Sequence, residues 1–186
     1  MTIGVFALQG AFLEHARVIE KLGHKAVEVR SLADTKKLDA VILPGGESTT
    51  MAKLLKKTGL DKWLVKVAKK GIPIFGICAG MILLSNRHFG LIDIDVARNA
   101  YGPQLDSFED EIVLRISRST PHAERRTFQG IFIRAPKITH AGKGVEVLGR
   151  HGRTPVLVRQ DNILAASFHP ELTNDTRIHE YFLKMA

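Results

Sequence analysis

The chain has 186 residues, of which 45% are hydrophobic and 25% charged, and it carries a formal net charge of +8. This is the length and composition of a globular protein with a substantial core, which excludes a disordered chain. A single cysteine excludes an internal disulfide, and no apolar stretch approaches the ~20 residues that a membrane-spanning helix needs. The apolar run at residues 3–8 is too short for a signal peptide and has no basic lead-in. We therefore expect one cytoplasmic domain spanning residues 1–186, with no membrane as partner.

The first half of the chain alternates predicted strands with predicted helices. An apolar run predicts a buried strand over 2–8, and a one-sided apolar face that stops at Gly23 predicts a helix over 11–22. The pattern then predicts strands over 26–29 and 40–43, helical segments over 50–70, a strand over 72–75 and a helix over 81–85. Such alternation is typical of an α/β fold, with a mostly parallel central sheet between two layers of helices.

The second half reads mainly as strands. These are predicted over 94–98, 112–116, 130–133, 145–148, 155–159 and 163–168. A closing helix is predicted over 174–185, with Asn174 or Asp175 as its cap.

The cysteine lies at a strand-to-helix turn. Cys78 stands between Gly76 and Gly80, after the predicted strand and before the predicted helix. This is the layout of a nucleophile elbow, in which glycine permits a tight turn and the free N–H groups of the helix favour a thiolate. A lone cysteine is also commonly a small buried hydrophobe, and Cys78 by itself leaves both interpretations open.

A candidate base and a carboxylate follow a later strand. His169 comes directly after the predicted strand 163–168, at the end of a strand where open α/β sheets carry their sites. Glu171 follows two residues later and shares a face with His169 if this segment is extended, so it is able to orient the imidazole. His169 alone reads as an ordinary loop histidine, but together with Cys78 the motif predicts a Cys-His-Glu triad.

A glycine-rich segment follows the predicted strand 40–43. Its sequence, Pro-Gly-Gly-Glu-Ser at 44–48, is strong turn chemistry by itself. Acyl transfer needs backbone N–H groups aimed at the developing oxyanion, and glycine lets them approach closely. Beside a candidate nucleophile, the segment is better interpreted as an oxyanion loop.

These three motifs together resemble the class I glutamine amidotransferases, which release ammonia from glutamine through a cysteinyl acyl-enzyme. Within that class the chain resembles, from end to end, the glutaminase subunits of pyridoxal 5′-phosphate synthase. The matching blocks lie at residues 7–15, 45–50, 98–102, 132–136 and 167–173. The resemblance implies a flavodoxin-like three-layer sandwich, L-glutamine as substrate and no cofactor or metal. It also implies that the partner, in a large hetero-oligomer, is the synthase subunit.

Carried over residue by residue, the resemblance implies Cys78 as nucleophile, His169 as general base and acid, and Glu171 as orienting carboxylate. It implies that glutamine is bound by Gly46, Glu47, Ser48, Arg98, Ile133 and Arg134. It further implies an oxyanion site at Gly46 and Ala79, with Gln9 completing that region. The residue types agree, because the planar fork of an arginine is suited to a carboxylate.

Two departures from the family pattern are visible. Pro103 stands where the family block usually continues with arginine, which removes a charge near the expected mouth of the site. The stretch 119–126 is longer than usual, and we interpret it as surface loop variation.

The lysines concentrate before Cys78, at positions 53, 56, 57, 62, 66, 69 and 70. They alternate with apolar residues at helical spacing, and no nucleic-acid-binding motif accompanies them. This favours a solvated helix face over a surface for an acidic partner, and both over nucleic acid.

Three alternative functions fit part of the pattern. The chain would serve imidazole glycerol phosphate synthase instead if the blocks at 45–50 and 98–102 were incidental. A cysteine peptidase or other thiol hydrolase would cleave peptides rather than glutamine. In a thiol sensor with a merely reactive Cys78, loss of His169 would leave function intact.

Overall fold

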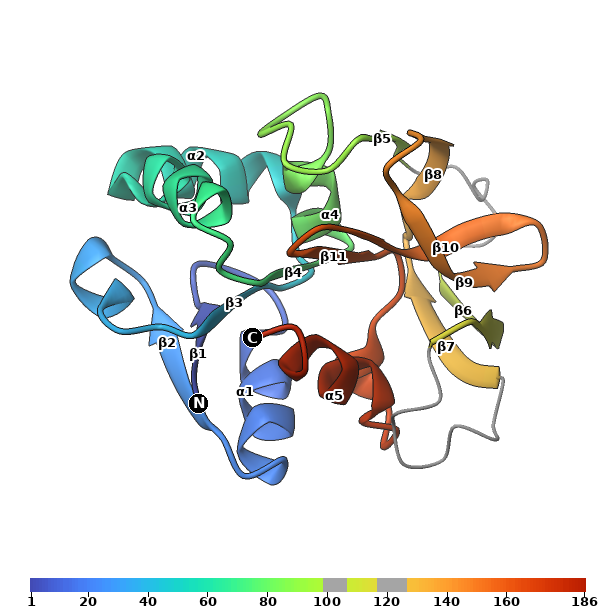
Figure 1. Cartoon of the computed structure of the whole chain (residues 1–186), viewed down its shortest axis with the longest axis horizontal. Coiled ribbons are helices and arrows are strands. Elements are labelled where there is room, and N and C mark those ends of the chain that lie inside the picture. Colours follow the sequence, from blue (N-terminus) through green and yellow to red (C-terminus); the bar gives the residue numbers. More distant parts are fainter. Residues whose placement is uncertain (99–106, 117–126) are drawn as a thin grey trace.

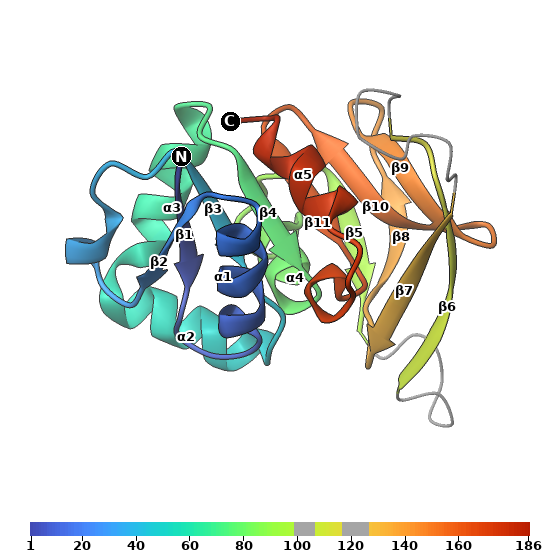
Figure 2. The same ribbon diagram turned by 90° about the horizontal axis from the view of Figure 1, so that it is seen from below.

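The computed structural model describes residues 1–98, 107–116 and 127–186. The features expected at Pro103 and at 119–126 lie outside these residues. Within them, nine strands form one sheet in the order β2-β1-β3-β4-β11-β10-β9-β6-β7, and β5 and β8 form a second, two-stranded sheet (Figures 1 and 2). No helix in the described ranges has the length and apolar character needed to cross a membrane.

The half of the large sheet that begins at β2 is parallel. Its strands are β1 (Thr2–Phe6), β2 (Lys25–Val29), β3 (Ala40–Leu43), β4 (Ile74–Ile77) and β11 (Ile163–Ala166). All residues of β3, β4 and β11 are buried. Parallel strands that are covered on both faces need such continuous apolar runs, and these are the runs that the sequence shows.

Helices cover both faces of this parallel half (Figure 1). One layer holds α1 (Phe12–Lys21) and α5 (Arg177–Leu183), and the other holds α2 (Ser48–Thr58), α3 (Leu60–Lys69) and α4 (Ala79–Leu84). Successive side chains of β3 enter different cores, because Ile42 packs on the side of α5 and Leu43 on the side of α2. The predicted α/β fold, a three-layer sandwich, is confirmed.

The other half of the sheet is antiparallel. It is formed by β10 (Thr154–Gln160), β9 (Glu146–His151), β6 (Ser107–Leu114) and β7 (Thr127–Ile133). The two-stranded sheet pairs β5 (Ile94–Ala97) with β8 (Lys137–Ala141). Strand β8 was not expected from the sequence, because its one buried residue, Ile138, stands among polar side chains.

Several boundaries differ from the prediction for local reasons. The helical stretch 50–70 is two helices, separated by Gly59 in the left-handed conformation with φ 73°. A short 3-10 helix, η1 (Leu32–Thr35), lies in the connection from β2 to β3. The N-cap of α5 is Thr176 rather than Asn174 or Asp175, although the Asp175 carboxylate accepts the backbone N–H of Arg177 at 3.1 Å.

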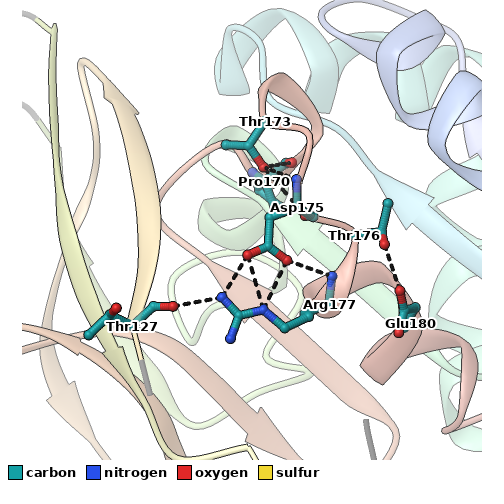
Figure 3. A network of polar contacts seen from close by, with 7 residues as sticks. All are labelled: Thr127, Pro170, Thr173, Asp175, Thr176, Arg177 and Glu180. Carbon is teal, nitrogen blue, oxygen red and sulfur yellow. Dashed lines mark hydrogen bonds and ion pairs between the residues drawn. The ribbon is translucent and has the colours of Figure 1, made fainter. Parts of the chain in front are cut away.

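A buried arginine fastens the start of α5 to β7 (Figure 3). The Arg177 side chain pairs with the Asp175 carboxylate, with Nη2 2.6 Å from Oδ2, and donates to the carbonyl of Thr127, also at 2.6 Å. The Thr173 hydroxyl donates to the carbonyl of Pro170 and accepts from the backbone N–H of Asp175. Arg177 therefore links the segment that follows His169 to Thr127 of β7.

Candidate active site

Cys78 occupies a strained turn between β4 and α4. Its φ is 49°, a left-handed conformation that a residue with a side chain rarely adopts. The turn is held because the N–H of Cys78 donates to the carbonyl of Ala166 at 2.8 Å and its carbonyl accepts from Ile82 at 3.1 Å. Two residues later only glycine fits, because a Cβ added to Gly80 would lie 2.2 Å from the carbonyl oxygen of Leu43. These features are those of a nucleophile elbow.

His169 and Glu171 form a buried pair beside this turn. The Nδ1 atom of His169 lies 2.7 Å from Oε1 of Glu171, which leaves Nε2 as the ring nitrogen available to Cys78. The backbone N–H of His169 donates to the carbonyl of Ile131 in β7 at 2.8 Å. The expectation of an extended segment is wrong, because residues Pro170–Leu172 form a 3-10 turn, η2. The turn itself brings the carboxylate back against the imidazole.

The protonation states of this pair follow from its contacts. Burial opposes a charge on His169, but hydrogen bonds with Cys78 and Glu171 outweigh it and raise the pKa of His169 to about 10. Burial also opposes ionisation of Glu171, but the neighbouring His15 and the hydrogen bond with His169 hold the pKa of this carboxyl below its usual range. At neutral pH the pair is an imidazolium beside a carboxylate.

A cavity of about 440 Å³ opens over Cys78 and His169. This volume is in the range of small-molecule sites. Its walls include all the residues predicted for the site except Glu171, which lies behind His169: Gln9, Gly46, Glu47, Ser48, Cys78, Ala79, Arg98, Ile133, Arg134 and His169. Four of the loops that contribute follow the C-terminal ends of β1, β3, β4 and β11, which are neighbours in the parallel half-sheet. Open α/β sheets place their sites at this edge.

One glycine-containing loop packs on the candidate base, and the other packs on that loop. A Cβ added to Gly45 would lie 2.4 Å from Cε1 of His169, so only glycine fits there. At Gly10, where φ is 90°, an added Cβ would lie 1.6 Å from the carbonyl oxygen of Gly45. Gln9 completes the contact, because its Oε1 accepts the backbone N–H of Glu47 at 3.0 Å. A shift of the backbone at Gly10 would therefore displace Gly45, and a shift at Gly45 would displace the imidazole of His169.

The carboxylate of Glu47 caps α2, a role that was not expected from the sequence. It accepts the backbone N–H groups of Thr49 and Thr50 and the hydroxyl of Thr50. These hydrogen bonds, that of the Thr50 hydroxyl foremost, lower the pKa of Glu47 to about 2. Glutamate is not among the residues usually found at an N-cap, so the sequence did not indicate this role.

Two arginines stand at the rim of the cavity. Arg98 follows β5 and its Nη2 lies 3.5 Å from the Thr49 hydroxyl, while Arg134 follows β7 with a positive φ of 42°. Both side chains are exposed and line the cavity. Ile82 and Pro136 also line it and were not singled out from the sequence, although 132–136 was one of the matching blocks. The cavity therefore combines a thiol, an oriented base and two cations able to hold a carboxylate.

A parallel half-sheet with a cysteine at a strand-to-helix elbow, and a histidine at the end of the neighbouring strand, defines the class I glutamine amidotransferase fold. Residues 5–186 match the model of the SNO glutamine amidotransferase family, and the chain belongs to this family.

Known relatives and solved structures agree with this placement. The chain is 50% identical to pyridoxal 5′-phosphate synthase subunit PdxT of Thermosipho africanus, over 100% of this chain and 98% of the relative. It is 48% identical to the subunit of the same name from Methanocorpusculum labreanum, over 100% and 97%. A crystal structure of a glutamine amidotransferase superposes with a TM-score of 0.89 at 43% identity, over 98% of this chain and 97% of the other. A chain in the structure of PurLQS from Thermotoga maritima, with a TM-score of 0.73 at 16% identity over 98% and 97%, shares the fold alone.

Proposed function

We propose that this chain hydrolyses L-glutamine to L-glutamate and ammonia, and that it passes the ammonia to a synthase subunit that makes pyridoxal 5′-phosphate. Family membership and relatives that are pyridoxal 5′-phosphate synthase subunits support this. The observation that carries the proposal is the His169–Glu171 pair at 2.7 Å, which shares one cavity with the thiol at the elbow. We further propose that residues 1–186 act as one domain, in the cytoplasm, where the free thiol of Cys78 stays reduced.

The reaction has two stages. The Cys78 thiolate attacks the side-chain amide of glutamine, and backbone N–H groups at Gly46 and Ala79 stabilise the oxyanion. His169, protonated beside the thiolate, donates its proton to the leaving nitrogen, so that ammonia departs and a thioester remains. Acylation removes the thiolate charge that helped to hold the proton on His169. The neutral imidazole is then able to activate the water that releases glutamate.

The substrate's amino-acid end is held by the rim of the cavity. Arg98 and Arg134 are the cations that bind the α-carboxylate of glutamine, with Ile133, Glu47 and Ser48 completing the wall around it. The side chain of glutamine then points inward to Cys78. The charge of the substrate is thus separated from the reacting amide.

Transfer to a partner is a chemical need of this reaction. Free ammonia at neutral pH is mostly protonated, and an ammonium ion is not a nucleophile. A synthase subunit docked on the face that carries the strand ends would keep water from the cavity. The contact between Gly10 and Gly45 gives docking a way to act on the oxyanion loop.

A covalent probe tests the proposal. A glutamine analogue with an electrophilic carbon in place of the amide should add once per chain, at Cys78, as measured by intact mass and peptide mapping. Glutamate release, measured with and without the synthase subunit, should be lost in Cys78→Ala and should be faster in the complex. Glutamate release by Cys78→Ala at the wild-type rate would refute the proposal, and preferential cleavage of peptides would point to a thiol peptidase.

A further inference from the structure

A histidine pair lies behind the candidate triad, on the side away from the cavity. His15 of α1 and His179 of α5 are both 0% exposed, and Nδ1 of His15 lies 2.9 Å from Nε2 of His179. The other ring nitrogen of His15, Nε2, points at Glu171 and lies 3.5 Å from Oε2. Polar side chains thus lie in a row from His169 through Glu171 and His15 to His179 of α5.

In this row, one nitrogen of His15 and one oxygen of Glu171 face each other, and neither atom has a hydrogen-bond partner among the described residues. Within the described ranges, Nε2 of His15 and Oε2 of Glu171 are buried and make no hydrogen bond. Their 3.5 Å separation is too long for a good hydrogen bond, and a buried polar atom left unpaired is costly. Hydrogen bonds in catalytic sites are often long in the free protein and shorten in the reacting complex.

The contacts define which nitrogens carry protons. A bare nitrogen of His15 would repel the carboxylate oxygen that it faces, so Nε2 of His15 carries the proton. The other nitrogen of a neutral His15, Nδ1, is then an acceptor, and the partner nitrogen of His179 must be the donor. Burial, the first cause in each case, lowers the pKa of His15 and lowers that of His179 to about 3, so both rings are neutral.

We propose that His15 is a positioning residue for the glutaminase reaction, and that it donates Nε2–H to the second carboxylate oxygen of Glu171 while His179 fixes its tautomer. His15 then holds one carboxylate oxygen of Glu171 and His169 holds the other, so the carboxylate cannot rotate. Its negative charge stays next to Nδ1 of the His169 imidazolium. This inference rests on the proposed function. It gives α1 and α5 a part in catalysis, although neither touches the substrate.

The competing explanation is that the two histidines only fill space in the core. Both rings do lie edge-on to Phe75, with centroids 6.4 and 6.0 Å away. Phenylalanine would fill that space as well, without placing unpaired polar nitrogens in the core. The charged groups that act on His15 are Glu171 and His169 from the segment after β11, and Glu14 from its own helix, with His179 as its neutral partner. A carboxylate is thus the nearest charge that it faces.

Matched variants separate the two explanations. His15→Phe keeps the ring and removes the donor, whereas His15→Gln returns an N–H near the position of Nε2. Ile19→Ala on the same helix truncates a fully buried apolar side chain and removes no polar group, so it controls for lost stability. Each variant is assayed for glutamate release with the synthase subunit present, over a range of pH, and for urea unfolding.

We expect kcat to fall about tenfold or more in His15→Phe with KM unchanged, which is the size of effect of a hydrogen bond to a charged group. The alkaline limb of the pH profile should move to lower pH, because His169 holds its proton less firmly. His15→Gln should recover most of the rate, and Ile19→Ala should lose stability but keep kcat.

A double variant gives the sharpest test. In a Glu171→Gln background, adding His15→Phe should have no further effect on kcat, since His15 acts through that carboxylate. Wild-type kcat in His15→Phe, or full additivity with Glu171→Gln, would overturn the inference and leave the proposed function standing. Absence of glutaminase activity in the wild-type complex would instead contradict the proposed function itself.

Discussion

At the scale of single residues, the proposed reaction depends on the pairing of His169 with Glu171. The imidazole has one nitrogen for the carboxylate and one for the thiol, and its pKa is raised to about 10. In the proposed reaction it is therefore an acid at neutral pH until acylation of Cys78 removes the neighbouring negative charge. This order of protonation is the one that amide hydrolysis needs.

Replacing the base should have a much larger effect than replacing the carboxylate. We predict that His169→Asn lowers kcat by about 10²–10⁴-fold, the usual contribution of general acid–base catalysis. Glu171→Gln should retain more activity, because its amide oxygen still accepts the N–H of His169. Glutamate release by the complex measures both, with Glu146→Gln on an exposed part of β9 as the control. Near wild-type turnover in His169→Asn would exclude His169 as the base.

The two rim arginines should affect binding rather than turnover. If Arg98 or Arg134 holds the carboxylate of glutamine, replacing it with Met should raise KM at a cost of about 1.5–3 kcal/mol, with kcat little changed. Arg153→Met, at an exposed position between β9 and β10, is the matched control. If KM is the same in both variants and the wild type, the substrate is held elsewhere.

At the scale of elements, the network in Figure 3 holds the segment after His169 against β7. Arg177 is only 6% exposed and its head group lies 5.9 Å from the ring centroid of Phe128. We predict that Arg177→Met destabilises the protein by about 1.5–3 kcal/mol, the range for hydrogen bonds to charged groups. Urea unfolding measures it, and Arg153→Met should stay within about 0.5 kcal/mol of the wild type. Equal free energies of unfolding for the two variants would show that the network does not stabilise the fold.

The elements that the sequence predicts best are those with a simple hydrophobic pattern. The strand 40–43 is recovered with its predicted bounds, because four consecutive apolar residues leave no other interpretation. β8 was missed because its side chains are mostly polar, and η2 because a Pro-Glu-Leu turn carries no periodicity. The predicted helical segments over 50–70 are two helices, separated by Gly59 in the left-handed conformation.

The sequence predicted which residues line the cavity better than it predicted the contacts that these residues make. Three motifs at strand ends indicated which loops meet, because carboxyl ends of neighbouring parallel strands share one edge. The capping role of Glu47 and the row from Glu171 to His15 and His179 were not expected. The cap is local to α2, but the row depends on how α1 and α5 pack on the sheet, and a motif does not contain that information.

At the scale of the whole molecule, the exposed lysines do not line the cavity. The seven lysines expected on a solvated face are all exposed, and they lie on or just after α2 and α3. The cavity is formed instead by the loops after β1, β3, β4 and β11.

The buried histidines should lower the free energy of unfolding as the pH falls. The pKa of His179 is lowered to about 3 in the folded chain and is near 6.5 when unfolded, so the unfolded state binds the extra proton. Stability from this group is complete above pH 6.5 and should fall by about 1.4 kcal/mol per unit as the pH drops toward 3. His15, whose pKa is also lowered, adds to the same trend.

Urea unfolding at a series of pH values measures this dependence. His179→Phe should reduce the slope below pH 6.5, because it removes one proton from the linkage. Ile19→Ala, which truncates a buried side chain and removes no titratable group, should lower stability but leave the slope unchanged. An identical slope in wild type and His179→Phe would mean that His179 is not buried as a neutral ring.

Formation of pyridoxal 5′-phosphate by the complex, with its nitrogen supplied either as glutamine or as an ammonium salt, tests the central claim most directly. The account predicts that the wild-type complex uses both sources, whereas the complex with Cys78→Ala uses only the ammonium salt and does so at the wild-type rate. That result would assign Cys78 to ammonia release alone and leave the synthase intact. Glutamine-dependent product formation near the wild-type rate with Cys78→Ala would contradict the account.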